Sequence, residues 1–235
     1  MELLKFSKGN AKLDKSIHTF SLPSGWTCPS AKDCLSKADQ KTGKITDGNE
    51  TKFRCFSASQ EALYPSVRKQ RWHNFNLLRT TDNMAELISK SLPKKAKIIR
   101  IHVAGDFFSQ AYMDAWIEVA KQRPDILFYA YTKSLNFWQN RVNDIPNNFK
   151  LTASEGGKND NLITKLGLKF ATVVFSEDEA KKLKLEIDHT DKLAYSTNKP
   201  FALLLHGVQK ANSEAAKALS LLKKSGKGGY SKNKK

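Results

Sequence analysis

The stretch IIRIHVAGDFFSQAYMDAWIEVAKQRPDILFYAYT, residues 98–132, decides the fold class. It opens on an apolar, β-branched run at 98–104, which predicts a buried strand. Residues 109–122 then place apolar side chains at helical spacing behind a serine suited to cap a helix. After the helix breaker Pro124, the apolar run 126–132 predicts a second strand. A strand, a helix and a strand in succession predict two parallel strands joined by a crossover helix.

The same alternation continues toward the C-terminus. Further strands are predicted at 149–154, 170–176 and 201–207, and the helices between and after them at 135–142, 161–167, 176–184 and 213–224. An apolar segment at 19–23 adds a first strand, and residues 58–92 are predicted to form one or two helices interrupted at Pro65. Six parallel strands can form a partial (β/α)6 barrel or a doubly wound sheet. We expect the partial barrel, in a single α/β domain over 1–224.

Composition and charge narrow the class of protein. The chain has 235 residues, 40% of them hydrophobic, which is enough for a packed core. We expect no membrane span, because no run of about 18 apolar residues occurs. The net charge is +17, and residues 225–235 form a lysine-rich segment that we expect to be flexible. This excess favours contact with a polyanion, first of all nucleic acid, although solvation of the surface explains it too.

All three cysteines fall in one polar segment, residues 25–56, which we call the cysteine loop. Cys28, Cys34 and Cys55 follow the first predicted strand with the spacing C-x5-C-x20-C. An odd number of cysteines and an N-terminus without a secretory apolar core indicate reduced thiols in the cytoplasm of a host cell. Thiolates are ligands for an iron–sulfur cluster, or for zinc if His18 or His73 completes a Cys3His set. Three unrelated free thiols are the remaining interpretation.

Polar or glycine-containing turns follow the predicted strands. In parallel α/β folds the carboxyl ends of the strands meet at one face, where ligands bind. The residues expected there as cofactor-binding candidates are Gly105, Asp106, Lys133, Ser154 and His206. Glycine permits close backbone approach and a carboxylate can receive an ammonium, although a tight turn with Asp106 as a helix cap is equally compatible.

Other residues have two interpretations each. His102 lies inside a predicted strand and is expected to be a hydrogen-bonded core residue, whereas His189 is expected in a loop. Aromatic and basic residues interleave at Tyr129, Tyr131, Lys133, Trp138 and Arg141. Such a set can stack on nucleic-acid bases, but packing on one face of a strand explains the tyrosines equally well.

Several long motifs, in order, resemble the "gene product 88" family of phage and plasmid proteins. They include LPSGWTCPSAKDC, TKFRCFSAS, IRIHVAGDFFSQAYMDAW, FYAYTKSLNFW, LTASEGG and FALLLHG, and the resemblance covers about residues 17–230. It implies an origin in a mobile element and no known activity.

The layout is also similar to that of radical S-adenosylmethionine enzymes. In that superfamily three cysteines bind a [4Fe–4S] cluster, and a Gly-Gly-Glu turn after the second strand helps to hold the amino group of S-adenosylmethionine. The resemblance implies Cys28, Cys34 and Cys55 as cluster ligands, with Gly105 and Asp106 in place of that turn. This sequence departs from the family in the wide spacing before Cys55 and in the shorter acid.

Three functions are compatible with the sequence. The first is a radical-S-adenosylmethionine-like iron–sulfur protein acting on or with nucleic acid, for which the sequence leaves open whether it is an enzyme. The second is a basic accessory protein that binds DNA or RNA and carries a structural Cys3His zinc site. The third is a metal-free structural protein of the mobile element.

Overall fold

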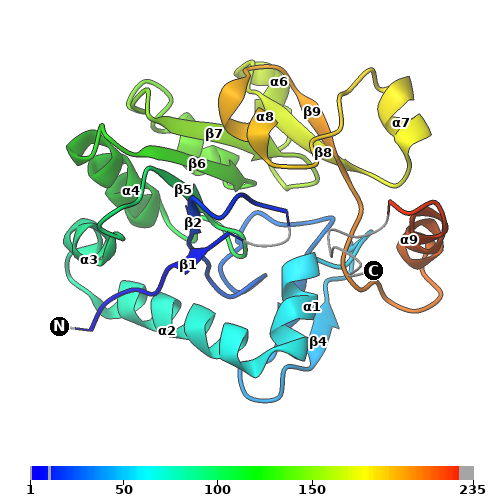
Figure 1. The fold of residues 1–235 in the computed structure, drawn as a ribbon, viewed down its shortest axis with the longest axis horizontal. Coiled ribbons are helices and arrows are strands. Elements are labelled where there is room, and N and C mark those ends of the chain that lie inside the picture. The colour runs from blue at the N-terminus through cyan, green and yellow to red at the C-terminus, as the bar shows by residue number, and fades with distance from the viewer. Residues whose placement is uncertain (1, 10–11, 228–235) are drawn as a thin grey trace.

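The computed structural model describes residues 2–9 and 12–227. A seven-stranded sheet forms the centre of the molecule (Figure 1), in the order β1-β2-β5-β6-β7-β8-β9. Its strands are β1 Ser7–Lys8, β2 Ile17–Thr19, β5 Ile98–Ile101, β6 Leu127–Thr132, β7 Phe149–Ser154, β8 Phe170–Val174 and β9 Phe201–Leu204. Every pairing is parallel except that of β1 with β2.

The strand order distinguishes between the two expected architectures. From β2 to β9 the strands lie side by side in the order in which they occur in the chain, whereas a doubly wound sheet reverses direction at a switch point. The doubly wound alternative is therefore wrong, and a mostly parallel α/β sheet is confirmed. Among the described residues no strand pairing joins β9 to β1 or β2, so the sheet is open. The partial barrel stays a prediction.

Helices cover one face of the sheet. α4 Gln110–Gln122 packs on β5, β6 and β7 through Trp116 and Met113, and it contacts α3 Met84–Ser91 (Figure 1). α9 Glu214–Lys224 and α7 Glu177–Lys182 pack on β8 and β9 in a second cluster. The short α5 Leu135–Gln139 and α6 Asn161–Lys165 lie beside each other. Ser109 caps α4 by accepting the N–H of Tyr112, as expected from the sequence.

The opposite face of the sheet is closed at one end by α8 Lys192–Ser196, which contacts β6 and β7. Its Ala194 joins a small core with Tyr129 and Phe201, whose side chains point away from α4. This five-residue helix was not predicted from the sequence. It leaves the other end of this face, near the carboxyl ends of the strands, open for a site.

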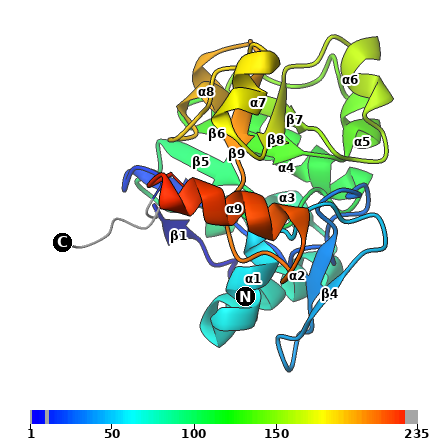
Figure 2. The same cartoon turned by 90° about the vertical axis from the view of Figure 1, so that its right-hand side faces the viewer.

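Three other predicted elements differ in their boundaries. The first strand ends at Thr19, but the chain stays extended through Leu22, whose N–H donates to Ala104 O. Residues 58–92 contain three helices rather than one or two: α1 Phe56–Leu63, α2 Pro65–Thr80 and α3. The cysteine loop contains a hairpin of β3 Ser36–Ala38 and β4 Ile45–Asp47, which packs beside α1 (Figure 2).

The predicted basic tail 225–235 lies largely outside the described residues. Of its described part, Lys227 forms an ion pair with Glu177 at 2.6 Å. Within residues 2–9 and 12–227, no helix combines the length and the apolar character that crossing a bilayer requires.

Candidate functional site

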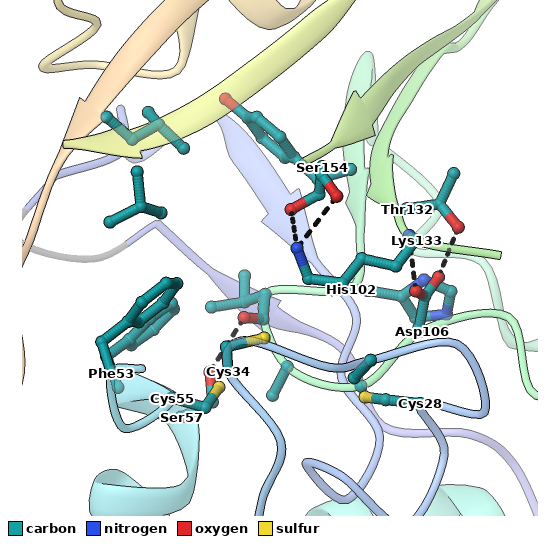
Figure 3. Close-up of a pocket in the computed structure, with 18 of the residues that line it drawn as sticks. Cys28, Cys34, Phe53, Cys55, Ser57, His102, Asp106, Thr132, Lys133 and Ser154 are labelled. Atoms are coloured by element: carbon teal, nitrogen blue, oxygen red, sulfur yellow. Dashed lines mark hydrogen bonds between the residues drawn. The ribbon is translucent and has the colours of Figure 1, made fainter. Parts of the chain in front are cut away.

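A cavity of about 930 Å³, including its open mouth, lies between the carboxyl ends of the strands and the cysteine loop. All eight predicted site residues line it: Cys28, Cys34, Cys55, Gly105, Asp106, Lys133, Ser154 and His206. They come from the cysteine loop and from the ends of β5, β6, β7 and β9, as Figure 3 shows for most of them.

The three thiols are unpaired and partly buried. Burial raises the pKa of Cys34 to about 11, although the Lys133 ammonium opposes that rise. Burial also raises the pKa of Cys28, and the nearby charges of Asp106, Cys55 and Cys34 raise it further. The thiols are therefore close enough to influence one another, and Figure 3 shows all three along the same wall. Binding a metal here would release protons from these groups.

Each thiol is positioned by local structure. Cys28 Sγ accepts the N–H of Gly25 at 3.3 Å. Cys55 precedes α1, and its carbonyl oxygen accepts the N–H of Ala58. The Cys55 sulfur thus sits at a helix N-terminus, where the partial positive charge favours an anionic ligand.

The base of the cysteine loop is anchored by a buried carboxylate. Glu61, on α1, accepts the N–H and the hydroxyl of Ser24 at 2.9 and 2.8 Å. The same oxygen, Oε1, accepts Arg71 Nη1 of α2 at 2.7 Å, and neither Glu61 nor Ser24 is exposed. This network fixes the point at which the loop leaves the sheet.

Asp106 joins two strand ends. Its Oδ1 accepts the Phe107 N–H at 2.7 Å and the Thr132 hydroxyl at 2.6 Å, and its Oδ2 accepts the Lys133 N–H at 2.8 Å. Burial raises its pKa to about 6, against the effect of these hydrogen bonds. A carboxylate offers about four acceptor positions, so one remains, on Oδ2.

A glycine is required at position 105 because Thr27 and Leu22 lie where a side chain would begin. Its φ is +83°, and a Cβ there would lie 2.6 Å from Thr27 Oγ1 and 2.7 Å from Leu22 Cβ. No side chain fits at those distances, so glycine lets the end of β5 pack against the base of the cysteine loop.

Lys133 points toward the end of β7 (Figure 3). Its ammonium donates to Ser154 O and to Ser154 Oγ, each at 2.9 Å, and to Glu155 O at 2.5 Å. These contacts use all three of its N–H donors. Lys133 therefore supplies positive charge near Cys34 rather than a free hydrogen-bond donor.

His206 lies at the end of β9. Its Nδ1 is 3.0 Å from Leu204 O, and its ring packs against Phe56 with centroids 4.6 Å apart and a tilt of 35° between the ring planes. Burial lowers its pKa to about 4, so the imidazole is neutral at physiological pH.

The two histidines proposed as a fourth zinc ligand lie elsewhere. His18 is on β2 and His73 is on α2, with its Nε2 2.9 Å from Leu3 O, and neither lines the cavity. The cavity histidines are His102 and His206. Within the described residues, no three His, Cys, Asp or Glu side chains are arranged to hold a single metal ion.

The cavity is also lined by residues that were not among the predicted cofactor-binding or metal-binding candidates. Arg100 and Tyr131 line its floor, and Phe53 and Phe56 its wall. Arg100 and Tyr131 could have been identified from the period-2 alternation of their strands, which places both on the face opposite Ile99 and Ala130. Phe53 and Phe56 carried no such signal.

Two other sequence interpretations are decided by burial. His102 is a core residue, 3% exposed, with Nε2 3.0 Å from the Tyr112 hydroxyl, as expected. Tyr129 and Trp138 are also buried, and Arg141 pairs with Asp114 at 2.8 Å. Tyr131 and Lys133 line the cavity, and the Arg141 side chain is partly exposed. The five residues therefore do not form one continuous surface for stacking bases.

Comparisons with known proteins place the chain in one family. The sequence profile described as Gene product 88 matches residues 3–222. The chain is 31% identical over 138 residues to the "Gene 88 protein" of Mycobacterium phage L5, covering 53% of this chain and 51% of that protein. The "Gene 88 protein" of Mycobacterium phage D29 is also 31% identical over 138 residues, covering 53% and 50%.

The chain thus spans about half the length of these curated relatives. No solved structure matches it. The profile, in contrast, covers every strand of the sheet, most of α9 and every residue of the candidate site. The chain therefore belongs to the gene product 88 family.

Proposed function

We propose that this protein is an iron–sulfur protein of the radical S-adenosylmethionine type, with Cys28, Cys34 and Cys55 as the ligands of a [4Fe–4S] cluster. One observation carries the proposal. Three cysteines spread over the cysteine loop line the same cavity, at the carboxyl ends of parallel strands. The sequential strand order also supports a partial (β/α)6 barrel around it.

The donor set fits such a cluster. Three thiolates leave one iron open to a further ligand. A single metal ion needs its sulfurs within a few ångströms, since each Zn–S bond is about 2.3 Å, whereas cluster ligands are spread around a larger cube. The absence of a single-ion arrangement among the described residues is compatible with that spread. Lys133 and the N-terminus of α1 supply positive potential for an anionic cluster.

The other site residues would orient the cofactor. The remaining acceptor position of Asp106 Oδ2 can receive the ammonium of S-adenosylmethionine. The Ser154 hydroxyl, which accepts from Lys133, keeps its own proton to donate. Gly105 and His206 shape the cavity beside them. A cluster held by these cysteines would supply one-electron reduction of S-adenosylmethionine, with the electron coming from an external reductant.

Anaerobic purification, with measurement of iron, sulfide and zinc, tests this function. We expect about four irons per chain after reconstitution and an absorption band near 400 nm, both lost in Cys28→Ser, Cys34→Ser and Cys55→Ser. Ser30→Ala, in the same loop, is the matched control and should keep the iron. S-adenosylmethionine should bind the reconstituted protein, as measured by calorimetry. Iron content that is unaffected by the three cysteine substitutions would overturn the proposal.

A second candidate function is contact with nucleic acid, and the net charge of +17 favours it. Affinity for DNA or RNA should fall steeply as salt rises, because bound counterions are released. Filter binding between about 50 and 200 mM salt measures this. If no binding occurs at the lower salt concentration, the positive charge serves only to solvate the surface.

The metal analysis also separates the two alternatives to an iron–sulfur protein. One zinc per chain without iron would favour a zinc-bearing accessory protein. A protein that holds neither metal would favour a structural protein of the mobile element.

The curated relatives are phage proteins, in agreement with the expected origin in a mobile element. A location in the cytoplasm of the host cell stays a prediction.

A further inference from the structure

The floor of the cavity, on the side away from the cysteine loop, is built from Arg100 of β5 and Tyr131 of β6. The Arg100 guanidinium lies over the Tyr131 ring, with 5.1 Å between its central carbon and the ring centroid. Arg100 is only 9% exposed, and α8 closes the sheet face beneath it. The two side chains therefore lie at the deep end of the cavity.

One nitrogen of the Arg100 guanidinium has a partner in the protein. Nη1 forms an ion pair with Asp191, which also pairs with Lys12 at 2.6 Å. Nε is buried and has no hydrogen-bond partner among the described residues. The ion pair with Asp191 thus fixes the side chain, while the edge of the guanidinium that carries Nε has no acceptor for that N–H among the described residues. That edge can donate two parallel hydrogen bonds to a carboxylate or a phosphate.

Tyr131 also has a buried polar group, its hydroxyl, without a hydrogen-bond partner among the described residues. Buried polar groups in folded proteins are nearly always hydrogen-bonded, so two unsatisfied donors on side chains that pack against each other need an explanation. A bound oxyanion would satisfy both.

The geometry points to an oxyanion subsite at this floor: Arg100 and Tyr131 bind the carboxylate or phosphate of a small-molecule substrate. The remaining walls indicate what lies between that group and the thiols. Val173, Leu203 and Leu205 are aliphatic, and Phe53 and Phe56 are aromatic. The substrate therefore has an anionic head at the floor and an apolar or aromatic body toward the cysteine loop.

This inference names the substrate class of the same cavity, so its link to catalysis rests on the proposed function. Binding itself needs no cluster, which keeps the two tests apart. Paired probes measure it on the purified full-length protein: benzoate against benzamide for a carboxylate, and adenosine monophosphate against adenosine for a phosphate. In each pair only the charged member carries the oxyanion.

Two tyrosines on one strand provide a matched comparison. Tyr131→Phe removes the hydroxyl and keeps the ring against Arg100. Tyr129→Phe removes another buried hydroxyl from the same strand, which has no hydrogen-bond partner in residues 2–9 and 12–227 and lies outside the cavity lining. Neither variant loses a hydrogen bond to a described residue, so both should fold. Arg100→Lys keeps a positive charge to pair with Asp191 but removes the planar guanidinium that can donate two parallel hydrogen bonds.

We expect one charged probe to raise the melting temperature of the wild type above that given by its neutral partner. Calorimetry should show affinity for that probe reduced about ten- to hundredfold in Tyr131→Phe and in Arg100→Lys, the scale for a hydrogen bond to a charged group. Tyr129→Phe should bind like the wild type, and the iron content of Tyr131→Phe should be unchanged.

Three results would overturn the subsite. They are equal binding of charged and neutral probes, no binding of either charged probe, and equal loss of affinity in Tyr131→Phe and Tyr129→Phe. Reconstituted wild-type protein that binds a charged probe but holds no iron would count against the cluster and leave the subsite standing.

Discussion

The Asp106 carboxylate accepts the backbone N–H of Lys133 at 2.8 Å, so the end of β5 is tied directly to the end of β6. The link lies beneath the cysteine loop, and the Lys133 side chain continues from it to Ser154 on β7. Three neighbouring strand ends are therefore held in one hydrogen-bonded chain. This makes Asp106 a structural residue of the site whether or not it also contacts a cofactor.

Asp106→Asn should therefore destabilise the fold. The amide keeps one acceptor oxygen and turns an N–H2 group toward a former donor, leaving a buried N–H unsatisfied. We expect the free energy of unfolding to fall by about 1–3 kcal/mol in urea titrations. Asp39→Asn is the matched control, because Asp39 also accepts three hydrogen bonds but is exposed in a turn. Equal losses for the two variants would contradict this role of Asp106.

Gly105→Ala should disturb the contact between β5 and the cysteine loop. The new methyl group would meet Thr27 and Leu22 at 2.6 and 2.7 Å, in addition to the strain of a positive φ. Gly167→Ala is the control, since Gly167 has a φ of +59° and nothing within 4 Å of the added Cβ. The control should lose about 1–2 kcal/mol of stability from backbone strain alone. Gly105→Ala should lose clearly more, and thermal unfolding of both proteins decides this.

Glu61→Gln should weaken the base of the cysteine loop. It removes the charge of a buried ion pair with Arg71 and puts an amide against the donors of Ser24. Breaking a buried pair by changing one partner is destabilising by about 3–5 kcal/mol. Glu86→Gln is the control, because its pair with Lys90 is exposed on α3 and is worth about 0.3–0.5 kcal/mol. Denaturant titration that gives similar losses for both would show the anchor to be dispensable.

His102 should make the fold sensitive to acid. Burial lowers its folded-state pKa to about 3, whereas the unfolded chain titrates near 6.5. Below pH 6.5 the unfolded state binds the extra proton, so stability is present above that pH and is lost as the pH falls toward 3. By pH 4.5 the loss from this group reaches about 2–3 kcal/mol, at 1.36 kcal/mol per pH unit.

His102→Asn tests this assignment, because asparagine tolerates the positive φ of +67° at this position. Its stability should fall less between pH 6.5 and 4.5 than that of the wild type, whatever its stability at neutral pH. Tyr112→Phe loses the contact to the imidazole but keeps the titrating ring, and should retain the acid dependence. An unchanged slope in His102→Asn would assign the acid sensitivity to other groups.

Much of the site could be predicted because parallel strands bring distant residues to one edge. Once residues 98–132 indicated a strand, a helix and a parallel strand, the polar turns after each strand had to converge. Cys28, Asp106, Lys133 and His206 accordingly line one cavity, although up to 178 residues separate them in the chain. The spacing of apolar residues along the sequence, which is a local property, was sufficient for that prediction.

Other features arise only from contacts between distant segments. The sequence left open whether the sheet was doubly wound, because local periodicity does not specify which strands become neighbours. It also gave no sign that Asp106 is hydrogen-bonded by the next strand, that Lys133 uses all its donors on β7, or that Arg100 pairs with Asp191 across 91 residues. The sequence alone thus determined that the residues after the strands gather at one edge of the sheet, since strand direction and side-chain alternation are encoded locally. The tertiary structure decided which hydrogen-bonding groups stay available to a ligand, since each partner comes from a segment that only folding brings near.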